Sequence, residues 1–121
     1  MKTAQIQLGG ELRTLDFTRA GLYDHIQDAS GMPAFDFLKS ITPKEGEQTT
    51  IIETAKMAVL IYAGLNSAHD VAGKPCIDFE TVKRWVRSVE ITELETVYNA
   101  VLTAMAGDQG EEKSQPEQGS N

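Results

Sequence analysis

Few side chains in this sequence could do chemistry, and the two histidines come first among them. His25 lies next to Asp24 and near Asp28 in a segment that is expected to be helical. Adjacent residues point in different directions on a helix, and only Asp24 and Asp28, four residues apart, share a face. We therefore interpret this group as a solvated polar face and not as a metal site. His69 precedes Asp70 at an expected helix end, where a positive charge suits the helix dipole.

Cys76 is the only cysteine, which excludes an intramolecular disulfide and a thiolate zinc site. As a nucleophile it would need a base, and His69 is seven residues away with a loop between them. A free cysteine is usually a small buried hydrophobe, and we interpret Cys76 in that way. The Gly9-Gly10 pair lacks the GK[ST] that follows in a phosphate loop, and no G-x-S-x-G or H-E-x-x-H occurs. The sequence thus predicts no enzyme, no catalytic residue, no metal and no cofactor.

Composition indicates a soluble globular domain. The chain has 121 residues, 40% of them hydrophobic, and a formal net charge of −7. Negative charge is repelled by phosphates, which argues against nucleic acid and anionic membranes as partners. The longest apolar run, residues 57–65, is far shorter than the roughly 20 residues of a membrane span, and the N-terminus does not read as a secretory signal. We expect a cytoplasmic protein.

Residues 4–17 predict a β-hairpin. Apolar and polar residues alternate before Gly9-Gly10, a pair that suits a tight turn with positive φ. On the return strand Leu12 is out of phase with the apolar residues that follow it. This predicts either a bulge or a longer loop after Gly10, and the sequence leaves both open.

The most apolar segment, residues 50–68, predicts a buried central helix. It contains no proline, and between Ala55 and Leu65 only Lys56 is strongly polar. A short core strand at Val59–Tyr62 is the rival interpretation, but the helix-compatible flanks favour the helix. A glycine inside a helix costs about 1 kcal/mol relative to alanine, so Gly64 indicates either a close helix crossing or the helix's own end.

Helix signals also surround this central segment. Thr18 is a candidate N-cap for a helix over 18–30 that Gly31 would close, and a short helix follows over 33–41. After a polar connection at 42–49 and the central helix, Asp78 is expected to cap a helix over 78–89. Thr92 and Glu95 have the spacing of a capping box for a last helix over 92–106.

These elements predict an α+β fold, mainly α, in which an N-terminal β-hairpin is followed by four to five helices packed round a central apolar helix. Residues 1–107 are expected to form a single folded domain. Residues 108–121 contain no apolar side chain and carry net negative charge, so they predict a disordered acidic tail.

Candidate partner-binding residues come from three places: the central apolar segment, a basic cluster and the last helix. The basic cluster has two interpretations, a complement to the dipole at a helix C-terminus or a docking patch for an acidic partner, and neighbouring Trp85 is expected in the core. The candidates are Tyr62, Gly64, Leu65, Lys83, Arg84, Arg87, Tyr98 and Leu102.

The order of these pieces resembles a known family. An N-terminal hairpin, IQLGGELRTLDFT, leads into a helix closed by Gly31. A central helix with AVLIYAGLNSAH, a capped helix with IDFETVKRWV, a last helix and an acidic tail follow. Over residues 4–105 this resembles the tail assembly chaperones of long-tailed bacteriophages and prophages, most clearly at 62–65.

The resemblance implies a non-enzymatic role in the host cytoplasm. Proteins of this family hold the long tape measure protein and help to recruit tail tube subunits, and many also occur as a longer frameshifted product. Self-association is expected as well, because the helices offer wide apolar faces. The alternatives are a small phage structural adaptor, such as a head–tail completion protein, and a helical peptide-binding regulatory domain.

The polar tail leads to a prediction about stability. Truncation after Gly107 should leave the melting temperature nearly unchanged, because the removed residues bury no apolar surface. Thermal unfolding of the full and truncated chains is the measurement. A loss of several degrees would show that the tail packs on the body.

Overall fold

The computed structural model describes residues 3–41 and 53–103. Its element order is β1 (Thr3–Leu8), β2 (Glu11–Asp16), α1 (Gly21–Ser30), α2 (Ala34–Ile41), α3 (Thr54–Ala72) and α4 (Phe79–Val86), and residues 91–103 are helical. The α+β, mainly α fold class is confirmed, with a hairpin followed by five helices in the described residues. The predicted connection at 42–49 and the tail at 108–121 lie outside the described residues.

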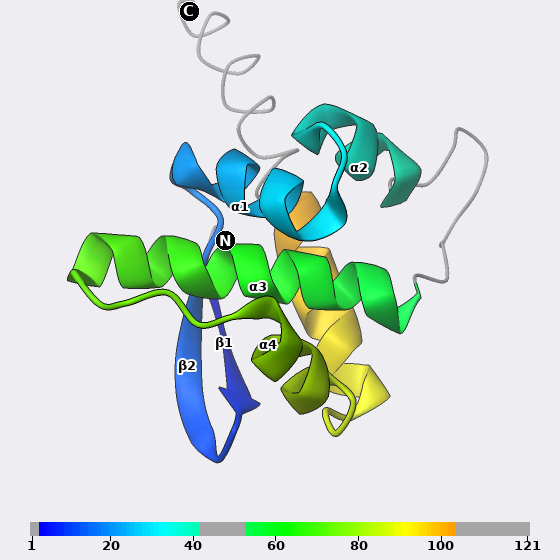
Figure 1. Ribbon diagram of the computed structural model, residues 1–121. Coiled ribbons are helices and arrows are strands. Elements are labelled where there is room, and N and C mark those ends of the chain that lie inside the picture. Colours follow the sequence, from blue (N-terminus) through cyan, green and yellow to red (C-terminus); the bar gives the residue numbers. More distant parts are fainter. Residues whose placement is uncertain (1–2, 42–52, 104–121) are drawn as a thin grey trace, which may run out of the picture.

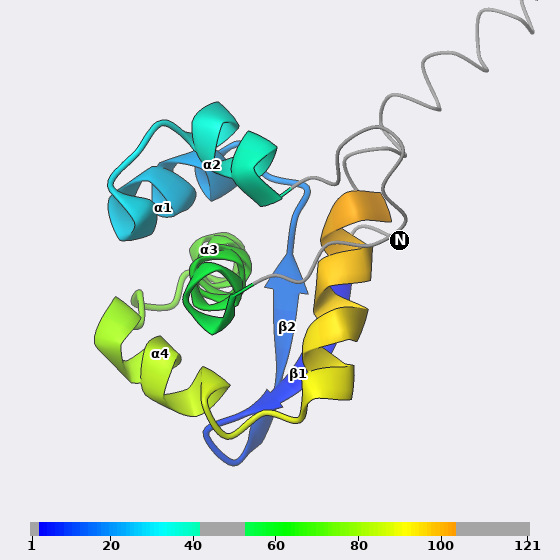
Figure 2. The same cartoon turned by 90° about the vertical axis from the view of Figure 1, so that its right-hand side faces the viewer.

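Helix α3 is the centre of the molecule. Figure 2 shows it end-on, with α1 and α2 on one side, α4 on the opposite side and the hairpin beside it. Every residue from Met57 to Ser67 is buried except Tyr62, which is half-buried. The helical interpretation of this segment is thus confirmed over the rival strand. No helix in the described part of the chain is long and apolar enough to cross a membrane.

Helix α3 extends further than predicted. It continues through His69 and Asp70 and ends at Ala72, four residues beyond the predicted end at residue 68. The buried stretch ends at Ser67, and the last turn is exposed, with Val71 57% exposed. Backbone bonds from Gly73 and Lys74 to the Asp70 and His69 carbonyls close this turn without burial.

The hairpin is regular, which corrects the prediction of a bulge or a longer loop. Leu8 pairs with Glu11 across a two-residue turn in which Gly9 and Gly10 have φ of 59° and 84°. Leu12 belongs to the opposite face of the hairpin from the buried residues and is 59% exposed. Leu12 is out of phase with the later apolar residues because its side chain is exposed on the other face of the hairpin. The backbone needs no irregularity to explain this.

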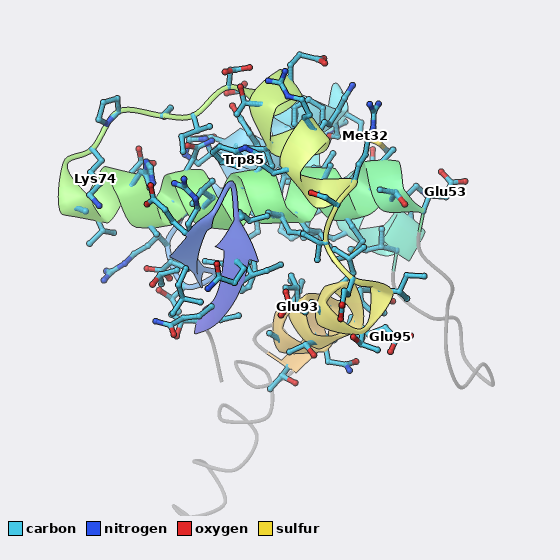
Figure 3. All side chains as sticks on the ribbon, turned by 90° about the horizontal axis from the view of Figure 1, so that it is seen from below. Met32, Glu53, Lys74, Trp85, Glu93 and Glu95 are labelled. Atoms are coloured by element: carbon cyan, nitrogen blue, oxygen red, sulfur yellow. The ribbon has the colours of Figure 1, made fainter. Side chains whose placement is uncertain are left out.

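Trp85 of α4 lies on the hairpin turn (Figure 3). A Cβ atom at Gly9 would lie 2.5 Å from the ring carbon Cε2, so only glycine leaves room for the indole. The Arg13 guanidinium lies 4.5 Å from the Trp85 ring centroid, and its Nε donates a hydrogen bond to the Leu8 carbonyl at 2.8 Å. Trp85 is half-buried, and it joins α4 to the hairpin at the rim of the core.

The start of α1 differs from its prediction. Thr18 does not cap the helix, which begins at Gly21. Instead the Thr18 N–H and Oγ1 donate to the Asp16 carboxylate at 2.9 and 2.5 Å, and Arg19 lies 3.5 Å from it. Burial alone would raise the pKa of Asp16, but the bonds from Thr18 and the charge of Arg19 outweigh it and lower the pKa. The threonine thus fixes the strand end and not the helix start.

For the other helix ends, two predictions are confirmed and two are wrong. Gly31 closes α1 with φ of 74°, and Asp78 caps α4 by accepting from the Thr81 N–H at 3.1 Å, both as predicted. Helix α4 then ends at Val86, short of residue 89. The last helix is already formed at residue 91, one residue before Thr92, so the predicted capping box is wrong. The bonds of its first turn run to the Glu90 carbonyl.

Gly64 marks a close approach, but the approaching element is the hairpin and not a second helix. A Cβ at Gly64 would lie 2.7 Å from Cε1 of Phe17 and 3.1 Å from Cβ of Leu15. Both residues are buried at the end of the hairpin, where the chain leaves β2. Gly64 is therefore the position where the hairpin packs directly on the backbone of α3.

We expect Gly64→Ala to destabilise the protein by about 1–2 kcal/mol. The new methyl would displace the Phe17 ring, and overpacking of this kind costs about 1–3 kcal/mol against at most about 1 kcal/mol gained in helix propensity. Urea unfolding measures the difference. Gly21→Ala is the matched control, because a Cβ there meets only Asp70 Oδ2 at 3.5 Å. Equal effects of the two variants would contradict the close approach.

Candidate functional site

The candidate partner-binding residues on α3 belong to the core. Leu65 is 1% exposed, and Gly64 is covered by Phe17. Tyr62 is half-buried, with its ring 5.3 Å from that of Phe79 and 6.0 Å from that of His25 in edge-on contacts. Gly64 and Leu65 are therefore not available to a partner in this structure, and Tyr62 is only partly accessible.

The basic cluster lies at the C-terminal end of α4, with Lys83 and Arg84 in the last turn and Arg87 as the C-cap. Lys83 is half-buried over the Phe79 ring and forms an ion pair with Glu80 at 3.3 Å. Arg84 and Arg87 are exposed at the C-terminal end of the helix. This position suits the dipole interpretation, and the two arginines remain open to an acidic partner.

On the last helix, Tyr98 has an internal role. It is 8% exposed, and its hydroxyl donates to the Ile41 carbonyl at 2.5 Å, which ties this helix to the end of α2. Leu102 is half-buried one turn further on. Figures 1 and 2 show this helix beside the hairpin. The structure therefore does not gather the eight candidates into one surface.

An apolar surface that the sequence reasoning missed lies on α1 and α2. Phe35 is 69% exposed and Tyr23 is 45% exposed, and their ring centroids are 5.6 Å apart. We call these two side chains the aromatic pair. The sequence signal for the exposure of Phe35 is its position on the helix. It lies off the face of α2 that buries Phe37, Leu38 and Ile41. Tyr23 likewise stands beside the buried stripe of α1 and not in it.

The chemistry-bearing residues meet in an arrangement that spacing did not predict. His25 Nε2 lies 2.8 Å from Asp70 Oδ2, although the residues are 45 positions apart. Cys76 lies beside this pair, and ligand atoms of the three side chains are all within 4.8 Å of one another. Cys76 is exposed and not buried as expected, and His69 is not directed at it but bonds to the Pro75 carbonyl at 2.8 Å.

The loop that carries Cys76 is fixed to α3 by Asn66. This side chain is fully buried, and it donates from Nδ2 to the Ile77 carbonyl at 3.0 Å and accepts from the Ile77 N–H at 2.8 Å. A single amide thus satisfies both backbone groups of one loop residue. Sequence reasoning missed Asn66, and the available signal was an amide that directly follows the long apolar stretch of the helix.

The surroundings of Tyr62 raise the pKa of its hydroxyl. Burial raises the pKa of the Tyr62 hydroxyl, and the negative charges of Asp28, Cys76 and Asp78 raise it further. The hydroxyl is therefore neutral near pH 7.

Comparison of the chain with protein-family models, curated proteins and solved structures finds no match.

We expect Asn66→Ala to destabilise the protein by about 2–3 kcal/mol, because the N–H and C=O of Ile77 lose their partners. Urea unfolding measures the global effect, and faster hydrogen exchange at the Ile77 amide reports the local one. Asn99→Ala is the control, since Asn99 is exposed on the last helix and its loss should change stability by less than about 0.5 kcal/mol. Unchanged exchange at Ile77 would contradict the role given to Asn66.

Proposed function

We propose that this protein is a non-enzymatic tail assembly chaperone of a long-tailed phage or prophage. It binds the tape measure protein in the host cytoplasm and assists assembly of the tail tube. The proposal rests first on the sequence resemblance over residues 4–105. A hairpin, a helix closed by Gly31, a central apolar helix and a capped helix occur in the structure in the same order, which supports the pattern behind the resemblance.

The structural observation that carries the proposal is the aromatic pair. Phe35 and Tyr23 are exposed and touch one another across two helices, whereas most large apolar side chains of the described residues are buried. Aromatic rings bury large apolar areas and tolerate varied partners. A chaperone that coats a long apolar polypeptide needs such a contact surface, and helix faces commonly provide it.

The net charge of −7 suits the same role. A protein that presents aromatic rings to an aggregation-prone partner must keep the complex in solution, and acidic residues are efficient at this. Because the attraction is apolar, the complex should persist at salt concentrations that screen surface charges. The tail tube protein is the second proposed partner, and self-association through the same pair is the form expected before the partner is made.

Co-expression with the tape measure protein encoded in the same phage or prophage genome tests the proposal. We expect the wild-type chain to keep that protein soluble and to be recovered with it. The double variant Tyr23→Ser, Phe35→Ser should bind about tenfold more weakly or worse, since loss of an aromatic anchor typically costs 2 kcal/mol or more. Ile91→Ser is the matched control, because Ile91 is 73% exposed but not part of the aromatic pair.

Two outcomes would count against the proposal. If the tape measure protein stays insoluble while this protein co-purifies with mature virions, the structural adaptor replaces the chaperone. If the tape measure protein is bound equally by the wild type and the double variant, the aromatic pair is not the binding surface.

A further inference from the structure

Three side chains with metal-ligating atoms converge from three separate elements. His25 projects from α1, Asp70 from the last turn of α3, and Cys76 from the loop that leads to α4. Nε2 of His25 and Oδ2 of Asp70 are 2.8 Å apart, and ligand atoms of all three residues lie within 4.8 Å of one another. Elsewhere in residues 3–41 and 53–103 no group of three such side chains comes together.

The backbone around Cys76 is held in place on both sides. The carbonyl of Pro75, the residue before it, bonds to the His69 ring at 2.8 Å. Ile77, the residue after it, is bonded through its N–H and its carbonyl to the buried Asn66. Both anchors belong to α3, the helix that also carries Asp70. The backbone on both sides of Cys76 is therefore held on the helix that carries Asp70, by bonds that involve neither the thiol nor the carboxylate.

We propose that His25, Asp70 and Cys76 form a binding site for a single Zn²⁺ ion. Imidazole nitrogen, thiolate sulfur and carboxylate oxygen are the three donor types that zinc takes from proteins. The sulfur argues against magnesium and calcium, which prefer oxygen ligands. Three protein ligands leave the fourth tetrahedral position to water, and the exposure of Asp70 and Cys76 gives water access.

The distances require only small movements. Bonds of zinc length put the donor atoms of a tetrahedral site about 3.3–3.6 Å apart. The Nε2–Oδ2 separation of 2.8 Å would open by about 0.5 Å as the ion replaces the hydrogen-bonded proton. The Cys76 sulfur, at most 4.8 Å from the others, would close by no more than about 1.5 Å on an exposed side chain.

The charges also suit a divalent cation. Aspartate and thiolate together supply two negative charges, which a divalent ion neutralises. The bound ion would tie α1, α3 and the loop before α4 together, and it is independent of the function proposed above.

Titration of the tag-free, reduced full chain with Co²⁺, a spectroscopic substitute for Zn²⁺, tests the proposal. We expect one equivalent to bind with a sulfur-to-cobalt charge-transfer band, and Zn²⁺ to displace it and to raise the melting temperature. Loss of even an outer partner of a metal ligand typically weakens binding 10–100-fold, so loss of a ligand should weaken it by about 100-fold or more. Cys76→Ser should therefore lose both the band and the rise in melting temperature, and His25→Gln and Asp70→Asn should bind correspondingly weakly.

Asp24→Asn is the matched control. Asp24 is exposed next to His25 in the sequence but is not part of the cluster, so this variant should bind like the wild type. A wild-type chain that binds no stoichiometric metal, or a cobalt complex without the sulfur band, would overturn the proposal. So would a Cys76→Ser variant that binds as tightly as the wild type.

Discussion

The packing of the hairpin on the backbone of α3 at Gly64 is the contact on which the rest of the structure depends. Phe17 and Leu15 occupy the space that a side chain at Gly64 would fill, so the end of the hairpin lies directly against the central helix. Helices α1 and α4 cover other sides of the same helix. Because α3 is enclosed in this way, its apolar residues need no amphipathic pattern, and the elements around it need only one apolar face each.

Two further contacts fix the position of α4 relative to this centre. At one end, Trp85 lies on the glycine turn of the hairpin and is covered by Arg13. At the other end, the buried Asn66 holds the loop that enters the helix. The helix itself is short, and isolated helices of this length are not stable in water. Tertiary contacts at both ends therefore maintain it, and they also bring Cys76 to His25 and Asp70.

The aromatic pair and the cluster of His25, Asp70 and Cys76 differ in the kind of ligand that they suit. The aromatic pair on α1 and α2 is an apolar contact area without charged groups of its own, which suits a partner recognised by burial and not by charge. The cluster of His25, Asp70 and Cys76 combines a ring nitrogen, a carboxylate and a thiol, and it suits an ion. Helix α1 carries one residue of the aromatic pair, Tyr23, and one of the cluster, His25.

The sequence by itself determined the local features of the structure, namely the hairpin, the central helix and some helix ends. Alternation and Gly9-Gly10 defined the hairpin, the long apolar stretch defined α3, and Asp78 and Gly31 defined one start and one end of a helix. These features depend on neighbours within a few residues, so periodicity and capping chemistry report them. The cap assigned to Thr18 was wrong because its hydroxyl bonds to the Asp16 carboxylate, and spacing does not choose between such partners. The cap assigned to Thr92 was wrong because the helix starts one residue earlier, with its first bonds to the Glu90 carbonyl.

Only the tertiary structure decided which residues meet. Gly64 was predicted to mark either a close helix crossing or the end of the helix, and the sequence could not tell that the hairpin, 47 residues away at Phe17, would pack on it. Cys76 was interpreted from the sequence as a small buried hydrophobe, whereas it is exposed and the chain path brings it to His25 and Asp70. Contacts between distant segments depend on how whole elements pack, and the free energy of that packing is shared among many side chains. No single residue or spacing carries it, so the arrangement of the candidate sites emerges only in the folded chain.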